Sequence, residues 1–145
     1  MITAAEFGWL DKLHALLQDG QSKGLSAEVN CTSLDNWTPL HFAANEGHAE
    51  IVDALLKQKG IEVSPVSKLR RTPLHLACVR GNQDIVRSLR DAGADLTLAD
   101  HEGNTPLHLA SESGTTNCII FLLKECDGVN ITARNNLGQT PNEIC

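Results

Sequence analysis

The tetrapeptide Thr-Pro-Leu-His occurs three times in this chain, beginning at Thr38, Thr72 and Thr105. A period of 33 to 34 residues indicates a repeated supersecondary unit, because one such unit cannot bury its apolar face alone and must stack on its neighbours. Three roles suit histidines that recur in this way: metal ligands, members of a catalytic set, or parts of the repeated structure. The histidines concerned are His41, His75 and His108.

Each copy of the unit predicts two helices and a turn. Thr-Pro is typical of a helix start, because the hydroxyl caps free N–H groups and proline suits the first helical position. The glycines at 47, 81 and 114 are expected to end the first helix. The second helix carries apolar residues with the spacing of Ile51, Val52 and Leu55, which gives one buried stripe. A short extended piece then leads to a turn or hairpin before the next Thr-Pro.

Degenerate copies occupy both ends of the chain. Near the N-terminus Gly8 aligns with Gly47 but no Thr-Pro precedes it, and Gly138–Pro141 opens a fifth unit. We expect the C-terminal edge of the stack to be covered, either by further chain or by another element. The predicted division is a divergent capping repeat at 1–32, full repeats at 33–66, 67–99 and 100–134, and a partial repeat at 135–145.

These motifs resemble the ankyrin repeat, and the match recurs in phase along nearly the whole chain. The best copy is Gly103–Ala110, and Ala92–Asp95 supplies the tail of the motif. The resemblance implies an all-α solenoid of stacked helix–turn–helix units with projecting β-hairpin or turn fingers. Asn36 and Arg70 stand where glycine is usual in a finger; asparagine tolerates that backbone, whereas Arg70 is expected to distort its finger. Glu143 replaces the fourth histidine.

The resemblance also implies a structural role for the histidines, in which they pack and hydrogen-bond backbone between neighbouring repeats. Whole repeats separate them, so they cannot share a metal ion at the nitrogen–zinc distance of about 2 Å. We therefore expect no metal site and no cofactor.

Neither an enzyme nor a nucleic-acid binder is favoured. No catalytic motif occurs, and the strongest candidate nucleophile, Cys78, lies on a small-residue helix face where we expect it to be buried. The net charge of −6 argues against a general nucleic-acid binder, although residues 65–99 carry six bases against three acids. An acidic or phosphorylated protein segment suits this basic middle better. No signal peptide or membrane-spanning run is recognisable, so we expect a cytosolic or nuclear protein.

The function that remains is a non-catalytic protein-interaction module: an adaptor, an inhibitor or a targeting subunit. A regulatory domain of a larger enzyme or channel is the alternative. Ankyrin-repeat proteins usually bind through the finger tips and the exposed side of the first helix. Trp37 is the expected anchor, because its counterparts in the other units are not aromatic. Carried over by position, the contact residues are Phe7, Leu34, Asp35, Trp37, Asn45, Glu46, Lys68, Leu69, Arg71, Val79, Arg80, His101, Glu102, Asn104 and Glu112.

Asn30 and Asn130 are candidates for modification. Both follow a valine at the base of a finger, where the asparagine resembles the substrates of the factor-inhibiting asparaginyl hydroxylase in ankyrin repeats. The competing interpretation is that each side chain orders its turn.

Overall fold

The chain folds into pairs of antiparallel helices that stack in one direction. The computed structural model describes residue 30 and residues 32–144, and these contain six α-helices, one short 3-10 helix and no strand. The elements are α2 (Pro39–Glu46), α3 (Ala49–Leu56), α4 (Pro73–Arg80), α5 (Gln83–Asp91), α6 (Pro106–Glu112), α7 (Thr116–Glu125) and η2 (Pro141–Glu143). The predicted capping repeat at 1–32 and Phe7 lie outside the described residues, apart from positions 30 and 32.

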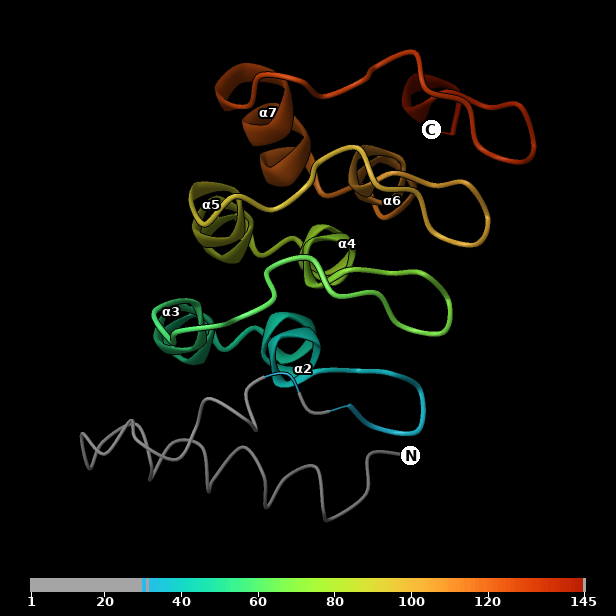
Figure 1. Cartoon of the computed structure of the whole chain (residues 1–145). Helices are drawn as coiled ribbons and strands as arrows, with labels where there is room; N and C mark the ends of the chain where they lie inside the picture. Colours follow the sequence, from blue (N-terminus) through green and yellow to red (C-terminus); the bar gives the residue numbers. More distant parts are fainter. Residues whose placement is uncertain (1–29, 31, 145) are drawn as a thin grey trace.

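Figure 1 shows two columns of helices. The inner column contains α2, α4 and α6, with η2 beyond α6, and the outer column contains α3, α5 and α7. Loops project from the inner column on the side away from the outer helices. The all-α repeat solenoid expected from the sequence is therefore confirmed.

Helix boundaries follow the local signals in the sequence. Thr38, Thr72 and Thr105 are the N-caps of α2, α4 and α6, and each is followed by proline at the first helical position. At the other end, Gly47 and Gly81 close α2 and α4 in left-handed backbone.

The core runs continuously between the two columns. Small residues such as Ala43, Ala44 and Ala77 on the inner helices let the columns approach closely, and all three are fully buried. The aliphatic stripe predicted for the second helices, including Val52 and Leu55, is buried against them. Burial of such apolar area is the main favourable term in the stability of the stack.

Each projecting loop is a tight turn, which we call a finger. The fingers are residues 33–37, 67–71, 100–104 and 135–139, numbered one to four. Successive fingers are joined by backbone hydrogen bonds, as where Lys68 N–H donates to the Asp35 carbonyl at 3.0 Å and His101 N–H donates to the Leu69 carbonyl at 3.0 Å. The described fingers contain turns and no strands. Of the two forms expected from the sequence, a β-hairpin or a turn, the structure has the turn.

Arg70 does not distort the second finger, contrary to the expectation from sequence. It adopts left-handed backbone with φ 57°, as Asn36 does with φ 59°. The turn keeps its hydrogen bonds, with Arg70 N–H donating to the Ser67 carbonyl at 2.8 Å and Ser67 N–H to the Arg71 carbonyl at 3.0 Å. The turn therefore keeps its backbone geometry, and Arg70 adopts a left-handed conformation that is unfavourable for a residue with a Cβ atom.

The sequence alignment equated Asn130 with Asn30, and the hydrogen bonds show that this equivalence is wrong. Thr132 donates its N–H and Oγ1–H to Asn130 Oδ1 at 3.0 and 2.9 Å, which reproduces the bonds from Thr97 to Asp95 Oδ1. Asn130 therefore corresponds to Asp95. The two extra residues of this repeat lie before Asn130, in the segment after α7.

Candidate functional site

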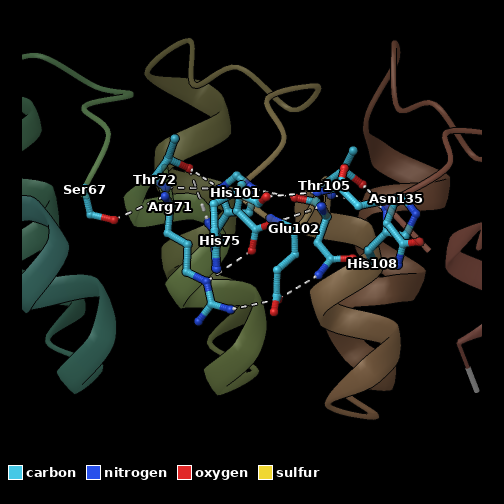
Figure 2. Close-up of polar contacts among 12 residues, drawn as sticks. Ser67, Arg71, Thr72, His75, His101, Glu102, Thr105, His108 and Asn135 are labelled. Atoms are coloured by element: carbon cyan, nitrogen blue, oxygen red, sulfur yellow. Dashed lines mark hydrogen bonds and ion pairs between the residues drawn. The ribbon is translucent and has the colours of Figure 1, made fainter. Parts of the chain in front are cut away.

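The three histidines form a buried ladder that ties each repeat to the next. In each, Nδ1 lies 2.8–3.2 Å from both the backbone nitrogen and Oγ1 of the N-cap threonine. Each Nε2 lies 2.9–3.0 Å from a carbonyl in the following finger, that of Arg71, Asn104 or Gln139. Since a carbonyl can only accept, Nε2 carries the proton and Nδ1 accepts. Figure 2 shows this arrangement around His75 and His108.

Both ring nitrogens are thus used within the protein, and none is left for a metal. Burial lowers the pKa of His41 from 6.5 to about 4 and also lowers the pKa of His75. The neutral imidazole is the form that can accept at Nδ1, so His41 and His75 are uncharged at neutral pH. These contacts support the structural interpretation of the histidines.

The fourth unit replaces histidine with Glu143 and keeps part of the same contact. A carboxylate oxygen of Glu143 accepts a hydrogen bond from Thr140 N–H at 2.8 Å. That bond is the main reason why the pKa of Glu143 is lowered.

A second polar ladder runs along the first residue of each finger, and the sequence analysis missed it. Ser33, Ser67, Asp100 and Asn135 each use a side-chain oxygen to accept backbone N–H groups of their own finger. Such side chains order turns by replacing a backbone acceptor. The recurrence of Ser, Ser, Asp and Asn at one position was the available signal.

Asp100 extends this ladder to the preceding finger. Its side chain is fully buried, and Oδ2 lies 3.2 Å from Arg71 Nε. Arg71 also reaches Glu102, with Nη2 3.9 Å from Oε2 (Figure 2). A buried carboxylate is costly without a partner, so Arg71 serves chiefly to neutralise Asp100 and link fingers two and three.

The contacts of Arg71 also involve a cluster of two carboxylates and one imidazole at the third finger. Asp100, His101 and Glu102 form the single group of potential metal ligands among the residues that the structure describes. Arg71 already pairs with both carboxylates, and Asp100 Oδ1 accepts two backbone hydrogen bonds. The guanidinium of Arg71 therefore compensates the charge of the buried Asp100, whereas the exposed Glu102 makes only a long contact of 3.9 Å with it.

Two predicted contact residues are largely withdrawn from the surface. Asn104 was expected at an exposed finger position, but it is buried, with its Oδ1 accepting from Asn135 Nδ2 at 3.0 Å. Trp37 is half-buried and packs on rings of its own repeat, at 5.0 Å from Phe42 and 6.0 Å from His41 between centroids. Tryptophan therefore has a packing role in addition to any binding role.

The remaining predicted contacts lie at the finger tips or on the inner helices. Arg80 Nε donates to Asn45 Oδ1 at 3.2 Å, which links α4 to α2, and Asn45 in turn donates to Glu46. Val79 is half-buried. The exposed members of the set are Leu34, Asp35, Glu46, Lys68, Leu69, Arg80, His101, Glu102 and Glu112.

Cys78, the candidate nucleophile of the sequence, lies in the core together with Cys118. Burial raises the pKa of both thiols. A thiol that resists ionisation is a poor nucleophile, so the packing interpretation of Cys78 is confirmed. Separately, no helix in the described part of the chain is long and apolar enough to cross a membrane.

Comparison with known proteins supports the repeat assignment. A family model described as "Ankyrin repeats (3 copies)" matches residues 1–100, and the "Ankyrin repeat" model matches residues 102–136. The human Ankyrin repeat and SOCS box protein 10 is 47% identical over 87 residues, which cover 60% of this chain and 18% of that protein. NF-kappa-B inhibitor alpha of Gallus gallus is 37% identical over 113 residues, covering 78% and 25% respectively. The chain thus spans a quarter or less of the length of these relatives.

Proposed function

Because the chain belongs to the ankyrin-repeat family, whose members are generally non-catalytic protein-interaction modules, we propose that it binds a protein on its finger and inner-helix face. The proposed role is that of an adaptor, an inhibitor or a targeting subunit in the cytosol or nucleus. Since the relatives are much longer than this chain, the proposal concerns the repeat module alone.

The observation that carries this proposal is a set of exposed leucines at the finger tips. Leu34 is 90% exposed on the first finger, Leu69 is 49% exposed on the second and Leu137 is 82% exposed on the fourth. Surface leucines occur singly in many proteins, but a recurrence on three of the four projecting turns is typical of a contact surface. Leu137 was not among the residues expected from sequence.

Charge suggests the nature of the partner. The second repeat presents Lys68, Arg70 and Arg80 to solvent, whereas Arg71 is occupied by Asp100. Lys68 has only a long contact of 3.9 Å with the exposed Asp35, which compensates little of its charge. An acidic or phosphorylated segment suits these cations. The exposed Glu102 and Glu112 of the next repeat would repel it and so limit its position.

Trp37 remains the proposed anchor of the site, with its partly exposed indole available to a ligand. Tryptophan and arginine are enriched among the residues whose truncation costs most in interfaces. Its packing on Phe42 means that Trp37→Ala must be checked for stability before its binding is interpreted.

The proposal can be tested with variants of the finger face. A partner captured by the wild-type chain would be purified and titrated against Leu34→Asp combined with Leu137→Asp, against Arg80→Glu and against Trp37→Ala. Each is expected to weaken binding by about tenfold or more. Asp53→Lys on the outer helix α3, also an exposed charge reversal, is the matched control and should bind normally. Normal binding by all three finger-face variants would place the site elsewhere.

Asn30 and Asn130 remain candidates for hydroxylation, now in two different positions. Asn30 spans two repeats, accepting from Glu62 N–H at 3.0 Å and donating to the Gly60 carbonyl at 2.8 Å, whereas Asn130 orders its own turn. Incubation with an asparaginyl hydroxylase, followed by intact-mass and fragment analysis, tests both. A chain that gains no oxygen atom would leave only the turn-ordering role.

A further inference from the structure

The outer helices carry a groove that the proposed function does not use. It lies between α5 and α7, has a volume of about 310 Å³ and is lined by Gln83 and Arg87 from α5 and by Ile120, Phe121 and Lys124 from α7. The outer column is on the opposite side of the stack from the fingers (Figure 1). A ligand in this groove would therefore leave the finger face free.

The corresponding positions of the preceding outer helices show which residues of the groove are unusual. Ile120 stands where the preceding outer helices have Asp53 and Arg87, and Phe121 stands where they have Ala54 and Ser88. The repeat framework thus forms without a large apolar or aromatic residue at these positions. The groove between α5 and α7 departs from the pattern, because Ile120 is 46% exposed beside an aromatic floor.

The two arginines beside the Phe121 ring differ in how far nearby groups neutralise their positive charge. The guanidinium carbons of Arg87 and Arg90 lie 5.4 and 4.9 Å from the Phe121 ring centroid. Arg90 is occupied, since it pairs with Asp91 at 2.7 Å and donates to the Glu125 carbonyl at 2.7 Å. Arg87 is half-exposed and has only Asp84 at 3.7 Å, an exposed pair that contributes little.

Lys124 supplies a second cation on the facing lip. Its side chain is exposed and makes no ion pair with any residue that the structure describes. Glu125 is the one acid among the groove-lining residues, so the lining carries a net positive charge in a protein of net charge −6.

We propose that the α5–α7 groove is a second docking site, which takes an acidic amphipathic helix from a protein partner. An apolar side chain of that helix packs on the exposed Ile120, over the buried ring of Phe121, and flanking carboxylates pair with Arg87 and Lys124. On α7 the positions 117, 120, 121 and 124 share one face, and on α5 the positions 83 and 87 do, which is the spacing that a helix laid along a groove contacts. The proposal does not depend on the finger-face site, and together the two sites would let the module bridge two proteins.

The test uses a fluorescein-labelled helical peptide of roughly five turns, with leucine along one face and glutamate on both flanks. Its twin has lysine in place of every glutamate. Fluorescence anisotropy with the whole chain measures affinity at low and physiological salt, and amide chemical shifts in an isotope-labelled sample locate the site. We expect the acidic peptide to bind, to shift the amides around Ile120 and Phe121, and to bind more weakly as salt increases. The lysine twin should not bind.

Variants distinguish this groove from general attraction of an acidic peptide. Lys124→Glu breaks no hydrogen bond or ion pair with the residues that the structure describes, and it should weaken binding by about tenfold or more, as should Arg87→Glu. Lys59→Glu, after the outer helix α3, is the matched control, because it reverses an exposed lysine outside the groove and the finger face and should leave the affinity unchanged. The proposal is overturned if the wild-type chain binds neither peptide, if both peptides bind equally, or if Lys59→Glu weakens binding as much as Lys124→Glu does. Loss of binding in the Arg80→Glu variant alone would point to the finger face and so would support the proposed function instead.

Discussion

At the scale of the residue, Arg70 holds the second finger in left-handed backbone at a conformational cost. Glycine has no such steric cost but loses more freedom on folding, so Arg70→Gly should stabilise the chain by about 0.5–1 kcal/mol. The midpoint of denaturant unfolding measures this change. Gly103→Ala is the opposing control, because a Cβ there would lie 2.8 Å from the Asn136 backbone nitrogen with φ already at 77°; it should destabilise by more than about 1 kcal/mol. A loss of stability in Arg70→Gly would show that the arginine side chain contributes more than its backbone costs.

At the scale of the element, the starts of α2 and α4 each depend on a neutral histidine, which makes stability dependent on pH. The pKa of His41 is about 4 in the folded chain and that of His75 is also lowered, against about 6.5 in the unfolded chain. The unfolded state therefore binds more protons between these values, so stability is complete above pH 6.5 and falls as the pH falls. Each histidine contributes at most about 1.4 kcal/mol per pH unit in that window. Unfolding midpoints from pH 7 to pH 5 should decrease, and His41→Gln, although less stable at pH 7, should reduce the slope. A flat profile in the wild-type chain would contradict the neutral ladder.

At the scale of the whole molecule, the last outer helix α7 and the turn after it expose apolar residues whose counterparts Leu56 and Leu96 pack on the core. Leu123 is 51% exposed and Ile131 is 57% exposed, whereas the corresponding Leu56 and Leu96 are only partly exposed and pack on the core. We predict that this edge is covered in the cell, and that the chain of residues 1–145 alone self-associates at high concentration and binds a hydrophobic dye. Combining Leu123→Glu with Ile131→Glu should abolish both properties without lowering the melting temperature, and Leu34→Glu at a finger tip serves as the control. Sedimentation that shows a monomer at all concentrations, together with no dye binding, would count against the prediction.

The sequence by itself determined the repeat, the helix starts, the two apolar faces and the burial of His41, His75 and Cys78. These features depend on residue spacings within one unit, and the same spacings occur in three units of this chain. Tertiary structure decided which finger residues are available to a partner. From sequence alone Arg71 and Asn104 could not be told from exposed finger residues. In the structure Arg71 pairs with Asp100, 29 residues further along the chain, and Asn104 accepts a hydrogen bond from Asn135, 31 residues further along. The groove over Phe121 likewise follows from contacts between repeats, whereas the position of Asn130 follows from hydrogen bonds within its own turn. A repeat motif encodes the interactions inside its own period, whereas exposure and charge compensation depend on which side chains the stack brings together across that period.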